Sequence, residues 1–114
     1  MDYLRALRVR RAGGRAMDAL LARFDALVAP TYPHVASPID APFATYFARE
    51  QRRNLGGVGN LCGLPSISVP SGFGERGLPT GLELLGRAWG EARLLAAAAA
   101  YQAQTDWHTK HPAV

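Results

Sequence analysis

Apolar positions recur with a helical period over residues 2–24. They form one heptad-spaced stripe, which contains Tyr3, Leu7, Met17, Leu21 and Phe24. This spacing predicts an amphipathic helix with Asp2 as its N-cap. Because a glycine in a helix interior costs about 1 kcal/mol relative to alanine, Gly13 and Gly14 predict a bend or fraying near the middle.

Three shorter segments carry strand-like patterns. Residues 25–29 form an apolar run that Pro30 and Pro33 close, which is typical of a buried strand ending in a loop. Residues 66–69 alternate between polar and apolar side chains, and residues 81–86 follow after a connection rich in glycine and proline. The last two segments predict a hairpin.

The final predicted element is a helix over residues 91–104. One face carries its apolar side chains, which are Leu94, Leu95, Ala98 and Tyr101. A run of alanines over residues 96–100 allows this helix to approach a sheet closely. Because a helix also leads into the first strand, the pattern predicts one α/β domain over residues 1–114, with a helix at each end packed on a short sheet.

Residues 30–63 are rich in proline and glycine, with a short helix around residues 43–53 as the one element suggested. Loops longer than about 12–15 residues are uncommon in compact domains. This segment is therefore expected to form a functional rim or to pack against another surface.

Composition narrows the class of protein. With 48% hydrophobic and 19% charged residues the chain should fold, and its apolar runs fall short of the ~20 residues that span a bilayer. We expect a cytoplasmic protein that binds no membrane. The net charge of +4 arises in the first 24 residues, where six arginines face two aspartates. Since no aromatic stacking platform accompanies them, a solvated or protein-facing helix is favoured over nucleic-acid binding.

Two glycine-rich segments resemble nucleotide loops only superficially. Residues 72–77 spell G-x-G-x-x-G, but a second strand follows instead of the helix that a pyrophosphate requires. The glycine cluster over residues 56–63 lacks the Gly-Lys-Ser/Thr ending of a P-loop. The sequence therefore predicts no cofactor.

No catalytic or metal-binding constellation is evident. Ser71 has Val69 where a nucleophile elbow needs glycine, and the single Cys62 lies between leucine and glycine, as a small buried residue does. His34, His108 and His111 lack an H-E-x-x-H spacing. We expect neither a catalytic residue nor a metal site within the chain.

Residues 25–33, 60–73, 77–87 and 91–95 resemble the closing segments of amidase signature enzymes in order, spacing and residue type. The most specific part is the stretch N-L-x-G-x-P-x-x-x-x-P at residues 60–70. The resemblance implies part of an amidase-signature fold, with a short mixed sheet. It also implies cleavage or transfer of carboxamide groups by a serine nucleophile, a second serine in a cis peptide and a lysine.

The chain departs from that pattern in one respect. It has no glycine/serine signature, and its only lysine is Lys110 near the C-terminal end. We therefore expect a C-terminal fragment of an amide hydrolase, active only when another chain supplies the catalytic half. The alternative is a stand-alone, non-catalytic interaction or scaffold module derived from an amidase.

The resemblance also implies a substrate-cleft wall formed by residues 31–40 and 56–63. Its candidate residues are Thr31, Tyr32 and Asn60. For the motif at residues 60–70 a structural role is favoured, in which Asn60 forms hydrogen bonds to backbone groups of the loop. The glutamine-using amidotransferase subunits carry an acidic residue seven positions before this asparagine, where the chain has Arg53. That difference favours a general amidase parent acting on a small amide.

The missing half of the fold would leave strand edges bare. An unpaired edge is a template for another chain, so a homo-oligomer or a complex with the chain that supplies the other half is expected.

The rejection of the glycine-rich loops is testable by thermal denaturation. A ligand at about 100 times its Kd would stabilise the protein by about 2.7 kcal/mol. NAD and ATP are expected to leave the melting temperature unchanged, and a saturable increase with either nucleotide would contradict this assignment.

Overall fold

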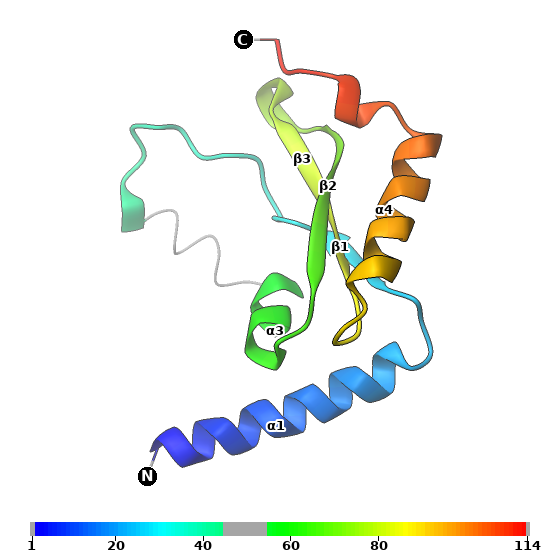
Figure 1. Ribbon diagram of the computed structural model, residues 1–114. Coiled ribbons are helices and arrows are strands. Elements are labelled where there is room, and N and C mark those ends of the chain that lie inside the picture. The colour runs from blue at the N-terminus through cyan, green and yellow to red at the C-terminus, as the bar shows by residue number, and fades with distance from the viewer. Residues whose placement is uncertain (1, 45–54, 114) are drawn as a thin grey trace.

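The computed structural model describes residues 2–44 and 55–113, and Figure 1 shows their arrangement. The helices are α1 (Asp2–Leu21), α3 (Leu55–Cys62) and α4 (Glu91–Gln104). The strands are β1 (Leu27–Pro30), β2 (Ser66–Phe73) and β3 (Pro79–Leu85). Two 3-10 turns, η1 (Glu75–Gly77) and η2 (Trp107–Thr109), complete the order. The predicted α/β class is confirmed.

The three strands form a sheet in the order β1-β3-β2. Both pairings are antiparallel, with Leu85 opposite Leu27 in β1 and opposite Ser66 in β2. The expectation of a mixed sheet is therefore wrong for the described residues. β1 and β2 do run in the same direction, but β3 separates them, so no parallel pairing forms between the two. The predicted hairpin is confirmed, with a bulge between Pro70 and Gly72.

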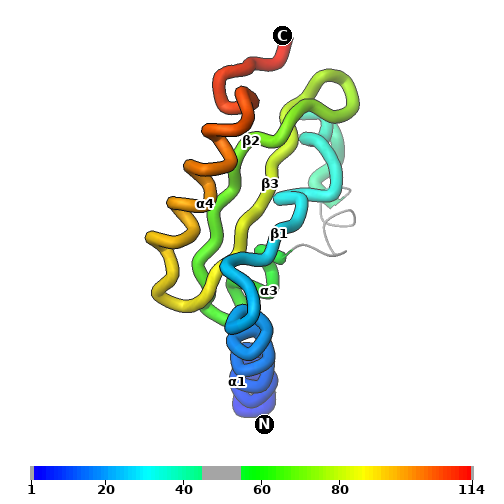
Figure 2. The backbone as a smooth tube through the Cα atoms, turned by 90° about the vertical axis from the view of Figure 1, so that its right-hand side faces the viewer, coloured from blue at the N-terminus to red at the C-terminus, as the bar shows by residue number. Residues whose placement is uncertain are grey.

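One face of the sheet packs against α4, as Figures 1 and 2 show. The buried residues of this layer are Val69, Leu84, Leu94 and Ala98, with Ile67, Leu82 and Tyr101 packed around them. The predicted bounds of the C-terminal helix are correct. The assignment of Leu95 to its packed face is wrong, because its side chain is 59% exposed. The contact stripe of α4 runs through Leu94, Ala98 and Tyr101 and leaves Leu95 beside it.

The opposite face carries α3, where the sequence predicted a glycine-rich loop. A methyl group added to Gly59 would lie 2.7 Å from Cδ1 of Leu85, which is completely buried. Glycine is a poor helix former. The close approach to β3 that Gly59 permits offsets this weakness, because tertiary packing can outweigh local propensity.

α1 crosses one end of the sheet and contacts α3 (Figure 1). It continues through Gly13 and Gly14, so the predicted bend or fraying there is wrong, and it ends at Leu21. A methyl group on Gly13 would lie 3.6 Å from Sγ of Cys62, which places this part of α1 against α3. Of the predicted stripe, Leu21 is buried, whereas Tyr3 at the other end of the helix is 75% exposed.

The layers leave much apolar surface uncovered. The radius of gyration is 16.4 Å, whereas a compact domain of about 100 residues has about 13 Å. Among the described residues the buried hydrophobic side chains are Leu21, Val35, Val69, Leu84, Leu85, Leu94 and Ala98. This core is thin for a chain of 114 residues, and the sheet has one well-covered face only.

The short helix expected around residues 43–53 lies mostly outside the described residues. Residues 43 and 44 are helical. Arg53 also lies outside the described part of the chain.

Two glycine substitutions separate packing from helix propensity. A methyl group on Gly14 meets no atom within 4 Å, whereas one on Gly59 meets Leu85. Both alanine variants gain the same helix propensity, so the difference between their unfolding free energies isolates the clash. We expect Gly59→Ala to be less stable than Gly14→Ala by about 1–3 kcal/mol in urea denaturation. Equal stabilisation by both substitutions would show that α3 does not pack on β3.

Candidate functional site

A hollow of about 780 Å³ lies beside the sheet, on the side away from α4. Most of its lining comes from the segment that follows β1, drawn in cyan in Figure 1, and the rest comes from β2 and β3. The lining residues are Thr31, Tyr32, His34, Val35, Ala36, Ser37, Pro38, Ile39, Ala41, Phe43, Ser68, Pro79, Thr80 and Gly81. Apolar side chains and hydroxyl groups therefore share one open cavity.

Gly81 shapes the floor of the hollow. The amide of Thr31 donates to the carbonyl oxygen of Gly81 at 2.8 Å, which extends the β1–β3 ladder beyond Pro30. Above Gly81 the hydroxyls of Thr31 and Ser68 lie 2.6 Å apart and share a hydrogen bond. A methyl group on Gly81 would lie 2.6 Å and 2.8 Å from these two oxygens. The hydroxyl pair can form because this position has no side chain.

The segment after β1 is held by the hairpin turn. Arg76 Nη2 donates to the carbonyl oxygen of Ala36 at 2.9 Å. Val35 is buried, and a methyl group on Gly74 would lie 2.7 Å from its Cγ1. Arg76 and Gly77 have φ values of 59° and 67° in this turn. The G-x-G-x-x-G stretch thus forms a tight turn that anchors the wall of the hollow, and it leads into β3, as the sequence predicted.

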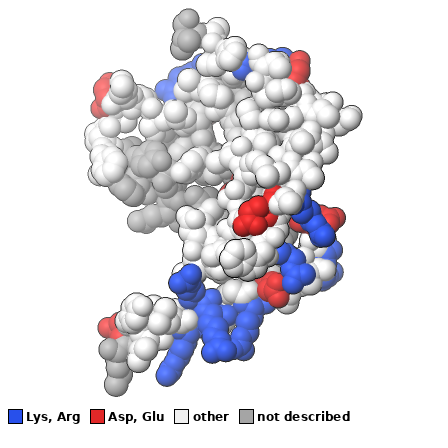
Figure 3. All heavy atoms as spheres, in the orientation of Figure 1, with Lys and Arg blue, Asp and Glu red and all other residues white. Residues whose placement is uncertain are grey.

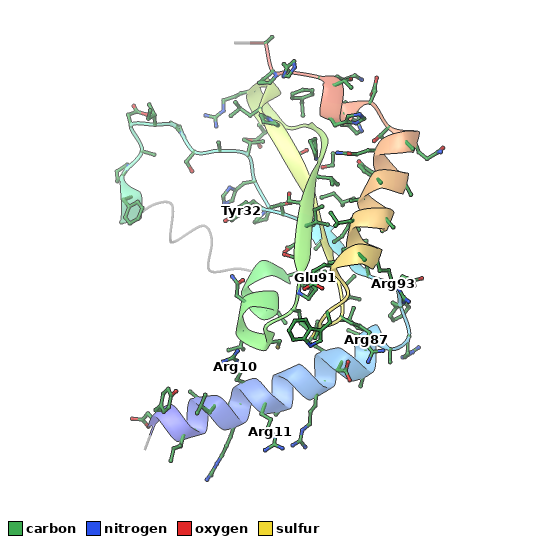
Figure 4. The ribbon with its side chains drawn as sticks, viewed as in Figure 1. Arg10, Arg11, Tyr32, Arg87, Glu91 and Arg93 are labelled. Carbon is green, nitrogen blue, oxygen red and sulfur yellow. The ribbon has the colours of Figure 1, made fainter. Side chains whose placement is uncertain are left out.

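Two aromatic rings lie along this wall. Tyr32 and His34 stack with 6.4 Å between ring centroids and an interplanar angle of 24°. Figure 4 labels Tyr32 beside the sheet, at the start of the segment that follows β1. Nδ1 of His34 lies 3.1 Å from the carbonyl oxygen of Val35. Because a carbonyl only accepts, this contact assigns the proton to Nδ1 and leaves Nε2 as an acceptor in the neutral ring.

Among residues 2–44 and 55–113, two buried polar atoms along the wall have no hydrogen-bond partner. They are Nε2 of His34 and Oγ of Ser37. Buried polar atoms without partners are rare in folded proteins, and each costs about 1–3 kcal/mol. Their burial therefore lowers the stability of the segment that follows β1.

The hollow brings together Thr31 and Tyr32, two of the three predicted cleft residues. Asn60 lies on α3 with its side chain exposed and is not among the lining residues. The role of these three residues in a substrate cleft stays a prediction. Sequence analysis missed Ser68, which it treated as the polar face of a strand, and His34 and Ser37, whose only signal was their place in a long loop.

The arginines of α1 lie outside the lining of the hollow. Arginines cover much of α1, as the blue surface in Figure 3 shows. Arg87, in the connection between β3 and α4, pairs with Asp18 of α1 at 2.8 Å. Arg93, in the first turn of α4, pairs with Asp25 in the connection between α1 and β1 at 3.2 Å, and Figure 4 labels both arginines. All four side chains are at least half exposed, so each pair adds little stability.

The chain's one lysine is engaged outside the hollow. Lys110 Nζ lies 2.8 Å from Asp106 Oδ1 and 4.3 Å from the centre of the Trp107 ring. Its hydrogen bond lowers the pKa of Asp106. No cluster of three metal-ligating side chains occurs among residues 2–44 and 55–113. In the same ranges no helix is long and apolar enough to cross a membrane.

Comparison with known proteins agrees with this arrangement. A family model described as Amidase matches residues 1–95. The A subunit of glutamyl-tRNA(Gln) amidotransferase from Ralstonia nicotianae is 38% identical over 115 residues, with 97% of this chain and 22% of the relative covered. The protein of the same name from Chloroflexus aurantiacus is 42% identical over 114 residues, covering 96% and 22%.

Solved structures share the fold. The crystal structure of the glutamyl-tRNA(Gln) amidotransferase A subunit from Thermotoga maritima superimposes with a TM-score of 0.64 at 32% identity, covering 81% of this chain and 20% of that one. The structure of PAM12A gives a TM-score of 0.66 at 36% identity, covering 93% and 21%. The chain therefore belongs to the amidase family, and it spans about a fifth of the length of these relatives.

The hydroxyl pair on the floor of the hollow can be tested by double-mutant cycles. Thr31 and Ser68 lie 2.6 Å apart, whereas Ser71 and Thr80 lie 3.4 Å apart at the limit of a hydrogen bond. The cycle of Thr31→Val with Ser68→Ala should give a coupling of about 0.5–1.5 kcal/mol in the free energy of unfolding.

The cycle of Ser71→Ala with Thr80→Val serves as the control and should give a smaller coupling. An equal or larger value there would show that the short contact does not organise the floor.

Proposed function

We propose that this chain forms one wall of the substrate cleft of an amide hydrolase, whose Lys/Ser/Ser residues come from sequence outside these 114 residues. The observation that carries the proposal is the hollow with its Thr31–Ser68 hydroxyl pair, on the sheet face that α4 leaves open. Membership of the amidase family supplies the chemistry, which is cleavage of a carboxamide C–N bond.

The hydroxyl groups of the hollow suit binding better than nucleophilic attack. A serine nucleophile needs an adjacent base to remove its proton. Ser68 shares its hydrogen bond with the hydroxyl of Thr31, which is no base at neutral pH. Within the described residues the lysine is engaged by Asp106. We therefore assign the wall residues a role in holding and orienting the amide substrate.

The identity of the complete enzyme rests on two cues. The relatives named above are subunits of an amidotransferase, so they work together with other chains. Arg53, at the position where glutamine-using subunits carry an acidic residue, favours an amidase that acts on other small amides. We favour an amidase that acts on small amides other than glutamine and is located in the cytoplasm. Its catalytic residues would come from a partner chain or from the rest of a longer chain.

The alternative is a stand-alone, non-catalytic module. It would have to close its own core, whereas the radius of gyration of 16.4 Å and the exposed apolar side chains along α1 favour a partner. We expect light scattering on a size-exclusion column to give a mass above that of a monomer, falling on dilution. A monomer of constant mass at micromolar concentration would favour the stand-alone module.

The purified chain should release no ammonia from simple aliphatic or aromatic amides, because among residues 2–44 and 55–113 no serine or cysteine side chain shares a hydrogen bond with a base. We expect hydrolysis to appear when this chain replaces the matching segment of the Chloroflexus aurantiacus amidotransferase relative, to which it is 42% identical. Turnover by the isolated chain, or a folded chimera without any amide hydrolysis, would contradict the proposal.

Two variants of the chimera test whether the hollow is part of the substrate cleft. Tyr32 lines the hollow, and Leu95 is exposed on α4 at the other face of the sheet. Tyr32→Ala should raise the KM for the amide severalfold, because it removes contact surface from the wall. Leu95→Ala is the control and should leave KM unchanged. Equal effects would show that the hollow is not the cleft.

A further inference from the structure

An exposed stripe of arginines runs along the outer side of α1. Its members are three or four residues apart, so they follow one side of the helix over about 15 Å. The opposite side packs on the body of the protein, where residues 13, 14 and 17 are half-buried and Leu21 is buried. Figure 4 labels Arg10 between α1 and α3, and Arg11 on the far side of the helix. The arginine stripe consists of Arg5, Arg8, Arg11 and Arg15.

The arginine stripe has no carboxylate partner in the described part of the chain. The ion pairs within residues 2–44 and 55–113 are Arg87–Asp18, Arg93–Asp25 and Lys110–Asp106. Like charges three or four residues apart on a helix repel one another, so the stripe weakens α1 as it stands. An acidic surface placed against it would offset this repulsion.

A second copy of the chain does not carry a matching excess of acidic groups. The net charge of +4 arises in the first 24 residues, and the rest of the sequence holds equal numbers of basic and acidic side chains. Two α1 helices placed face to face would bring like charges together. Charge complementarity therefore assigns the acidic surface to a different molecule.

Apolar side chains next to the stripe indicate what kind of molecule this is. Leu4 lies one turn before Arg8 and is 63% exposed, and Tyr3 and Leu7 beside it are exposed as well. A phosphate backbone offers these side chains no apolar contact, whereas protein interfaces combine arginine and tyrosine with apolar groups. A bilayer would need the apolar side of α1, which is packed on the body of the protein through Leu21. The surroundings of the stripe therefore favour a protein.

We propose that the arginine stripe is a docking surface for an acidic helix of another protein. A guanidinium group holds a carboxylate through two parallel hydrogen bonds, and acidic residues with the same three- and four-residue spacing would meet successive arginines. Leu4 would pack against apolar residues beside the acidic row. The inference goes beyond the proposed function, because the stripe lies outside the hollow and needs no amide chemistry.

Binding of a defined peptide to the full chain tests this surface. The probe is a helical peptide of about 20 residues, with glutamates along one side at three- and four-residue spacing and leucines beside them. We expect saturable binding in fluorescence anisotropy, weakening about three- to tenfold between about 0.05 M and about 0.3 M salt. The same peptide with glutamine in place of glutamate should bind at least about tenfold more weakly.

Charge-matched variants locate the surface. Arg8→Gln/Arg15→Gln removes two charges of the stripe and should weaken peptide binding about three- to tenfold. Arg23→Gln/Lys110→Gln removes the same charge outside α1 and should change the affinity less than about twofold. Leu4→Asn should also weaken binding, because the apolar contact is lost. Circular dichroism of each variant checks that its helices are retained.

Equal affinity for the glutamate and glutamine peptides would overturn the inference, as would an equal loss in the two double variants. Failure of the acidic peptide to bind would also overturn it and would leave the stripe as a solvated surface. Tighter binding of an RNA duplex or of phosphatidylserine vesicles would assign the stripe to a nucleic acid or a membrane instead. None of these measurements involves amide hydrolysis, so their outcome is independent of the proposed function.

Discussion

The central strand β3 is the element on which the other layers depend. It hydrogen-bonds to β1 along one edge and to β2 along the other, so both ladders of the sheet pass through it. Its alternating side chains serve opposite layers: Leu84 packs beneath α4, and Leu85 packs against α3. Because side chains of a strand alternate strictly, a shift of one residue in its register would exchange these two layers and dismantle both.

The same alternation places the floor of the hollow. Gly81 lies four residues before Leu85 and therefore on the same face of β3. With no side chain there, Thr31 from the end of β1 and Ser68 from β2 meet above the strand. The wall then rises through residues 32–39 and is tied back to the hairpin turn by Arg76. The candidate site is therefore positioned by residues at the strand pairings of the sheet.

Sequence patterns predicted the elements whose periodicity is strong. The hairpin and the helix over Glu91–Gln104 were located correctly because their apolar positions and their flanking glycines agree. The helix over Leu55–Cys62 was missed, since its stability depends on the approach of Gly59 to Leu85, which no local pattern encodes. The same limit explains why α1 stays regular through Gly13 and Gly14.

The candidate site was only partly predictable for a similar reason. Thr31 and Tyr32 follow a strand end, where cleft residues are common, and both line the hollow. Asn60 belongs to a conspicuous motif, but α3 carries it outside the lining. His34 and Ser37 were not predicted, because the burial of their polar atoms without hydrogen-bond partners in the described part of the chain is a property of the folded protein. Residue spacing does not reveal it.

The central claim is that this chain is a wall that requires further protein surface to complete its core. Scanning calorimetry of the isolated chain, at a dilution where it is monomeric, tests this most directly. A self-contained domain of 114 residues should unfold cooperatively with an enthalpy of about 80 kcal/mol near 60 °C. An incomplete wall predicts a broad transition with a much smaller enthalpy. A sharp two-state transition with the full enthalpy would contradict the claim.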